Sequence, residues 1–357
     1  MPFLSTAANE MRSSDNHVVG SIRGIPASWY RPSRPLYWTD LLVTALIGWV
    51  SFAETVRLSS GLRLLSFSVT TFALYRAVLF IHELAHVNRR DLPHFELVWN
   101  LLIGLPLLVP SFLYQNVHLD HHRQKTYGTQ RDPEYLPFAH RPLTAIVLYA
   151  LGALLFPLAL VVRFGLLAPV SWANTRIRKM TVERCSALII NYEYVRRKVP
   201  DGPWWLQELA CTSLCWIAAL SWCVGWVPGR VFLWWGIVGS AVSSINAVRA
   251  LSAHRYDHDG TELTSMEQLL DSCTLTQQHL QSLTGLVAAW QALWAPVGLR
   301  YHALHHWIPA LPYHNLGRAH RLLLTAIDDQ LPYRATLRDT MWATVADLIS
   351  RSLRRRP

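Results

Sequence analysis

The sequence predicts an all-α integral membrane protein: a helical bundle with about four transmembrane helices, in-plane or re-entrant segments, and a cytosolic cap that holds clustered histidines. Of its 357 residues, 51% are hydrophobic and only 16% are charged, against about 25% charged residues in an ordinary soluble protein. Several apolar runs approach the roughly 20 residues that a helix needs to cross the hydrocarbon core. The 16 tryptophans suit a membrane interface, where amphipathic rings are enriched.

Three parts are expected along the chain: a cytosolic lead-in over residues 1–36, a membrane domain over 37–325 and a cytosolic basic tail over 326–357. The lead-in is polar, contains many glycines and prolines, and has no apolar core of a signal peptide. A tight Pro228-Gly229 turn joins the last two of the spans that we expect. These spans cover residues 41–56, 64–81, 206–227 and 231–251.

Two further apolar segments are not expected to cross the membrane. Residues 97–113 are broken by Gly104, Pro106 and Pro110, which favours a kinked re-entrant or in-plane segment. Residues 143–167 are interrupted by Pro157 and carry Arg163 near their end. Because the basic loop that follows is placed in the cytoplasm by the positive-inside rule, we expect this segment to lie in the interface or to form a hairpin.

The net charge of +10 comes almost wholly from arginine. Arginines beside a membrane attract anionic lipid, and a basic surface can also receive an acidic partner protein. No nucleic-acid-binding module accompanies the charge, so we do not expect a nucleic-acid partner. After residue 254 the sequence is soluble in character, except for an amphipathic stretch over residues 283–299 that could lie on the membrane.

Three histidine clusters carry the chemistry: His82-Glu-Leu-Ala-His86, His118-Leu-Asp-His121-His122 and His302-Ala-Leu-His305-His306. Offsets of three and four share a helix face, so each cluster is expected to aim its imidazoles at one point. Neutral imidazole is the commonest metal ligand in proteins and suits iron, zinc and copper. Eight histidines exceed what one tetrahedral zinc needs, and two metal ions fit the number.

A structural role, a zinc peptidase and a haem site are the alternatives to a pair of metal ions. A lone histidine at an interface is usually structural, but three clusters of matching spacing need a shared role. The first cluster also matches the HExxH pattern of zinc peptidases, with Glu83 as general base. A single zinc, or a haem held by two histidines, would leave most of the remaining histidines unused.

At these clusters the sequence resembles the membrane-bound fatty acid desaturases and their hydroxylase relatives, which share three histidine boxes in this order. The resemblance covers about residues 37–325 and implies a non-haem di-iron centre with a ninth ligand at His254 and His258 as an extra or alternative ligand. It also makes Glu83, Asp120 and Asp132 candidates to orient the ligand rings through hydrogen bonds. The implied box ligands are His82, His86, His118, His121, His122, His302, His305 and His306.

The resemblance implies an oxidoreductase that uses dioxygen and two electrons to desaturate a fatty acyl chain of a lipid or thioester. A hydroxylase, or a carotenoid or sphingoid oxygenase, of the same superfamily is the alternative, and a membrane zinc protease is a more remote one. The chain lacks the HPGG motif of a fused cytochrome b5, so the electrons are expected from a separate ferredoxin or cytochrome b5. The abundance of arginine favours a bacterial cytoplasmic membrane, with the site on its cytosolic side.

Overall fold

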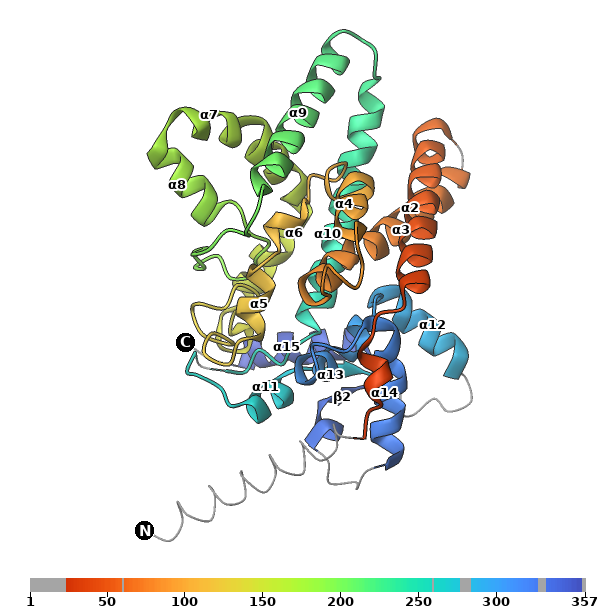
Figure 1. The fold of residues 1–357 in the computed structure, drawn as a ribbon, viewed down its shortest axis with the longest axis vertical. Helices are drawn as coiled ribbons and strands as arrows, with labels where there is room; N and C mark the ends of the chain where they lie inside the picture. Colours follow the sequence, from red (N-terminus) through yellow and green to blue (C-terminus); the bar gives the residue numbers. More distant parts are fainter. Residues whose placement is uncertain (1–23, 60, 259, 277–283, 327–331, 355–357) are drawn as a thin grey trace.

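The computed structural model describes residues 24–354 except residues 60, 259, 277–283 and 327–331. Nearly every element in these residues is helical, which confirms the predicted all-α class, and two short strands pair in parallel (Figure 1). The elements are α2 (Arg34–Arg57), α3 (Gly61–His86), α4 (Phe95–Trp99), α5 (Val117–His122), α6 (Leu143–Val162), α7 (Ala168–Ala173), α8 (Thr175–Arg184), α9 (Trp204–Cys223), α10 (Gly229–Leu251), α11 (Ser265–Asp271), β1 (Thr274–Leu275), α12 (Thr284–Trp294), α13 (His302–Trp307), α14 (Tyr313–Ala326), β2 (Leu337–Arg338) and α15 (Met341–Arg354).

The long apolar helices and the short helices of the C-terminal part occupy opposite ends of the molecule. In Figure 1, α2, α3, α9 and α10 rise toward the top, whereas α11, α13, α14 and α15 form a cap at the bottom. The apolar side chains Leu46, Leu148 and Leu233, from three different long helices, are 65%, 67% and 61% exposed. Such outward-facing leucines suit a hydrocarbon environment, so the long helices form the membrane part of the protein.

Four helical segments are long and apolar enough to cross a membrane. Three coincide with predicted spans. The fourth starts at Leu143, where a segment in the interface or a hairpin was expected, and the helix over residues 204–223, also expected to span, is not among the four. The four segments are Ala27–Arg57, Gly61–His86, Leu143–Ala173 and Gly229–Leu251.

Long-range partners explain why Pro157 and Arg163 do not end the helical segment that begins at Leu143. Pro157 lies inside α6 and packs against Gly239 of α10. The buried Arg163 guanidinium lies 2.5 Å from Glu208 and 2.7 Å from the Ser186 hydroxyl. The proline is therefore accommodated by a residue without a side chain, and the arginine charge is neutralised within the protein.

Residues 95–113 turn back on themselves, as the glycine and prolines predict. α4 continues as a π-helix to Gly104, and the chain then reverses toward a 3-10 turn that begins at Ser111. The side chain of Asn100 closes this reversal, because it accepts a hydrogen bond from the Ser111 backbone N–H at 2.9 Å and donates one to the Ser111 hydroxyl at 2.9 Å. The Trp99 indole N–H donates to the Ala77 carbonyl of α3 and anchors the segment beside that helix.

The C-terminal region packs against the rest of the protein. α15 contacts α6, α10 and the turn Phe138–His140, and its Leu348 is fully buried. The boundaries proposed for the lead-in and the tail stay predictions. Parts of these expectations lie outside the described residues, namely residues 1–23, the start of the amphipathic stretch at residue 283, and residues 327–331 and 355–357 of the basic tail.

Gly239 should be hard to replace, because a Cβ atom there would lie 2.8 Å from Cγ of Pro157. We expect Gly239→Ala to push α6 and α10 apart and to lower the free energy of unfolding by about 1–3 kcal/mol, as overpacking does. Gly236 on the same helix has nothing within 4 Å of a Cβ, so Gly236→Ala is the matched control. Thermal unfolding in detergent should show a lower Tm for Gly239→Ala alone; equal Tm values would contradict this packing.

Candidate metal centre

Four parts of the chain deliver nine histidines to one place at the junction of membrane helices and cap. The last turns of α3 carry His82 and His86, while α5 and α13 carry three histidines each. His254 follows the end of α10 and is held by an isolated bridge to Ser272. All nine are buried or half-buried, so the short polar helices of the cap meet around a histidine-lined interior.

The nine histidines form two groups, and within each group the potential ligand nitrogens all lie within 4.8 Å of one another. Each group is large enough for one metal ion. The first group consists of His82, His86, His118, His122 and His305, and the second of His121, His254, His302 and His306.

The second and third clusters are divided between the two groups, which corrects the expectation that each cluster aims at a single point. His118 and His122 join one group while His121 joins the other. Successive residues on an α-helix are about 100° apart, so the neighbouring His121 and His122 cannot face the same ion. Each HxxHH cluster therefore connects the two groups.

Distances between ring nitrogens fit a shared metal ion. The Nε2 atom of His122 lies 3.0 Å from Nε2 of His118 and 3.1 Å from Nε2 of His305. In the other group, Nε2 of His302 lies 2.9 Å from Nε2 of His254 and 3.1 Å from Nε2 of His306. Two nitrogens at about 2.1 Å from one ion and at right angles to each other are separated by about 3.0 Å.

Several buried ring nitrogens have no hydrogen-bond partner, among them both nitrogens of His82 and Nε2 of His86. An unpartnered polar atom in a protein interior is costly, at about 1–3 kcal/mol. Coordination of a metal ion would satisfy these nitrogens. The donor set therefore fits a pair of metal ions better than it fits a purely structural cluster.

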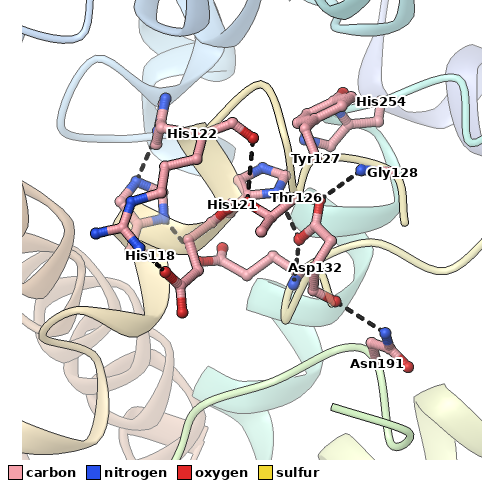
Figure 2. Close-up of polar contacts among 12 residues, drawn as sticks. His118, His121, His122, Thr126, Tyr127, Gly128, Asp132, Asn191 and His254 are labelled. Atoms are coloured by element: carbon pink, nitrogen blue, oxygen red, sulfur yellow. Dashed lines mark hydrogen bonds and ion pairs between the residues drawn. The ribbon is translucent and has the colours of Figure 1, made fainter. Parts of the chain in front are cut away.

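The Asp132 carboxylate lies on the Nδ1 side of the His121 ring. Its carboxylate oxygens lie 2.9 and 3.0 Å from Nδ1 of His121, and it also accepts from the Gly128 backbone N–H (Figure 2). Asn191 donates to the Asp132 carbonyl at 2.9 Å, as Figure 2 shows. A proton held on Nδ1 leaves Nε2 free to bind a metal. Asp132 thus lies where a ring-orienting carboxylate would lie, and that role stays a prediction.

Two further orienting groups were missed from the sequence. Glu134 lies 2.6 Å from Nδ1 of His118. The Tyr127 hydroxyl lies 2.8 Å from Nδ1 of His254 and donates to Asp271, also at 2.8 Å. Glu134 could have been found from its position two residues after Asp132, whereas nothing in the local sequence marks Tyr127 or Asp271.

The remaining sequence candidates lie elsewhere. Asp120 pairs with Arg123 and accepts from the Tyr194 hydroxyl, and no bond to a histidine is found for it among the described residues. Glu83 accepts from the Tyr37 hydroxyl, and its carboxylate lies 3.8 Å from Nδ1 of His82, beyond hydrogen-bond distance.

His258, the alternative ligand, is outside both groups of histidines. Its Nε2 lies 2.5 Å from the Thr261 carbonyl, and its backbone N–H donates to the Tyr135 hydroxyl. The structure therefore brings His254 to the centre and directs His258 to a neighbouring loop.

Burial holds most of these imidazoles in the neutral form. It is the main cause that lowers the pKa of six of them well below the ordinary value, with neighbouring histidines adding to the effect. Burial also lowers the pKa of His121, but the charge and hydrogen bond of Asp132 outweigh it and raise that pKa. Neutral imidazole is the form that a metal ion requires. The six are His118, His122, His254, His302, His305 and His306.

A cavity of about 760 Å³ leads from the membrane helices to the histidines. Its lining is mostly apolar and comes largely from α3, α6 and α10, and it reaches His82 of the first group and His254 and His302 of the second. The volume is within the roughly 300–1,000 Å³ of ligand pockets. Such a cavity can hold a lipid chain with one segment beside the metal centre.

A family model described as Fatty acid desaturase matches residues 59–337, which include all nine histidines. The chain belongs to the fatty acid desaturase family. A protein named ceramide hydroxylase from Caulobacter vibrioides (strain NA1000 / CB15N) is 38% identical to it over 344 residues, or 95% of each protein. No solved structure matches the chain.

Membership of the fatty acid desaturase family confirms the superfamily predicted from the three boxes. Together with the four apolar helices, it makes the chain a membrane oxidoreductase of lipid metabolism. It also removes the support for a zinc protease, because the HExxH residues are one part of a nine-histidine centre.

Proposed function

We propose that this protein is a di-iron hydroxylase of ceramide or a closely related N-acyl sphingoid lipid. The 38% identity to the Caulobacter ceramide hydroxylase over 95% of both chains carries the proposal, and it favours the hydroxylase alternative over the acyl desaturase that the sequence alone indicates. The histidine groups and the apolar cavity that reaches them are consistent with such a substrate.

In this proposal each histidine group holds one iron ion. The chemistry supplied by bound iron is the activation of dioxygen for attack on an unactivated C–H bond, with two electrons from a separate donor of the ferredoxin or cytochrome b5 type. The first ion is assigned to His82, His86, His118, His122 and His305, and the second to His121, His254, His302 and His306.

The protein's own part is to orient ligands, place the substrate and exclude water. Asp132, Glu134 and Tyr127 fix three rings through their Nδ1 atoms, and such partners raise the basicity of the nitrogen facing the metal. The apolar cavity walls select a lipid chain and keep water from the reacting carbon. Which carbon is attacked then depends on how the lipid is held in the cavity.

We further propose that the centre faces the cytosol from a bacterial cytoplasmic membrane. The cap that surrounds the histidines lies at the end of the bundle where α3 and α10 finish. The basic segment after Leu167 returns to this end, because Arg196 donates to the Phe112 and Gln115 carbonyls just before the second histidine cluster, and the positive-inside rule assigns that segment to the cytoplasm. The source of the Caulobacter relative supports a bacterial membrane.

Product mass tests the reaction. The wild-type chain and His305→Ala should be expressed in a host that contains ceramides, with lipids compared by mass spectrometry. A gain of one oxygen atom in ceramide, present only with the wild type, supports hydroxylation. A loss of two hydrogens would instead support desaturation, the second candidate, which the family description favours. Identical lipid profiles in the presence of a working electron donor would contradict both.

The wall of the cavity gives a separate prediction. Gly152 of α6 lines the cavity, and a Cβ there would meet nothing within 4 Å. A phenylalanine at this position can therefore fold normally while narrowing the cavity, and we expect Gly152→Phe to lower kcat/KM for ceramide by about tenfold. The neighbouring Leu151 is exposed and does not line the cavity, so Leu151→Phe is the control. Equal kcat/KM values for the two variants would show that the lipid does not bind in the part of the cavity lined by Gly152.

A further inference from the structure

The lining of the cavity changes character along α10. Trp235, Gly239 and Val242 give it an apolar surface at the end far from the histidines, and Ser243, Asn246 and Arg249 follow toward His254. Arg249 is ten residues beyond Gly239, or about 15 Å along the helix. The cavity therefore has an apolar end inside the bundle and a polar end beside the metal centre.

Arg249 has unused hydrogen-bonding capacity at that polar end. Its Nη2 donates to Oδ1 of Asn246 at 2.8 Å, while its Nε is buried and has no hydrogen-bond partner. A guanidinium carries five N–H donors in a fixed fork. No carboxylate among the described residues forms an ion pair with it, and the Tyr75 hydroxyl engages part of the fork. The buried Nε is therefore the donor that remains available to an acceptor in the cavity.

Two carboxylates beside the metal centre are already engaged there. Glu134, which also lines the cavity, accepts hydrogen bonds from His118 and from the Tyr114 hydroxyl. Asp271 accepts from Tyr127 and Tyr135. An oxygen atom of a bound lipid is a suitable acceptor for the buried Nε of Arg249.

Arg249 also lies close to the reacting position. Arg249 precedes His254 by five residues and lines the same cavity as His254 and His302. A lipid oxygen bound at Arg249 would thus place the first carbons next to that oxygen beside the centre, and the remaining chain would extend toward Gly239.

We infer that Arg249, held by Asn246, binds an oxygen of the substrate's polar region, so that the oxidised position is counted from the polar end of the lipid. The inference rests on the proposed ceramide hydroxylation and adds a residue that sets its position. An arginine in the last turn of a helix can also serve only to stabilise the helix dipole, and the experiment must separate these roles.

The first test uses the wild-type protein with ceramides that differ only in chain length. Tandem mass spectrometry of the products locates the new hydroxyl group. A hydroxyl at a constant number of carbons from the amide, whatever the chain length, supports the inference. A hydroxyl at a constant number of carbons from the methyl end would overturn it. Absence of hydroxylation for every ceramide would contradict the proposed function instead, and the binding test then decides the role of Arg249.

The second test measures binding independently of turnover. Native mass spectrometry of the purified protein with ceramide should show binding weakened by about 10–100-fold in Arg249→Met, as expected for loss of a hydrogen bond from a charged donor. Arg230 on the same helix is exposed and does not line the cavity, so Arg230→Met should bind like the wild type. Unchanged binding in Arg249→Met would overturn the inference.

A conservative variant separates recognition from helix stabilisation. Arg249→Lys keeps the charge near the end of α10 but loses the planar fork. If Arg249 acts only on the helix dipole, Arg249→Lys regains the thermal stability that Arg249→Met loses and places the hydroxyl group as the wild type does. That result would overturn the inference. We expect instead that Arg249→Lys has the thermal stability of the wild type but gives products with the hydroxyl group at more than one position.

Discussion

Iron analysis of the purified wild-type protein, loaded anaerobically with ferrous iron, is expected to give about two ions per chain, one for each histidine group. His302→Ala should lower this to about one, because the group of four is left with three histidines. Its hydroxylase activity should fall by more than about 100-fold, the upper end of what loss of an orienting partner costs. Metal analysis by mass spectrometry and product analysis check both expectations.

Two more histidines serve as comparisons. His86→Ala leaves four histidines in the group of five, so we expect it to retain more iron than His302→Ala. His258 belongs to neither group and contacts the Thr261 carbonyl, so His258→Ala should keep two ions and normal activity. A wild-type content of one ion per chain, or loss of iron in His258→Ala, would contradict the assignment of ligands.

The part of the site that could be predicted from the sequence depends on short residue spacings within each cluster. Offsets of three and four pointed to the eight box histidines that the structure brings together, and the resemblance to the desaturases and hydroxylases added His254, which joins them. How the clusters divide between the two groups was not predicted from the sequence. That division could have been inferred, because adjacent residues such as His121 and His122 point about 100° apart on a helix and so face different ions once two ions are assumed.

Local interpretation also missed residues whose partners are distant. Pro157 and Arg163 argued against an unbroken helical segment only while Gly239 and Glu208 were unknown. In the same way, the Tyr127 hydroxyl reaches His254, 127 residues further along the chain. Such contacts exist only after folding, so composition and periodicity cannot indicate them.

Removing the orienting carboxylates should weaken the centre without removing a ligand. Asp132→Asn keeps the size of the side chain but replaces a carboxylate that lies 2.9 and 3.0 Å from Nδ1 of His121. We expect iron affinity or hydroxylase activity to fall by about 10–100-fold, the usual effect of losing such a partner. Glu134→Gln should behave alike, because Glu134 stands in the same relation to His118. Iron titration and initial rates measure the two effects.

Asp120 provides the matched control for these variants, because it lies inside the second cluster but contacts Arg123 and Tyr194. Asp120→Asn should therefore leave iron affinity and activity within about twofold of the wild type, as for surface substitutions generally. The three variants together distinguish position in the sequence from position in the fold. If position within the histidine cluster in the sequence decided the effect, Asp120→Asn would lower iron affinity and activity most. If contact with a histidine Nδ1 atom decides it, Asp120→Asn lowers them least.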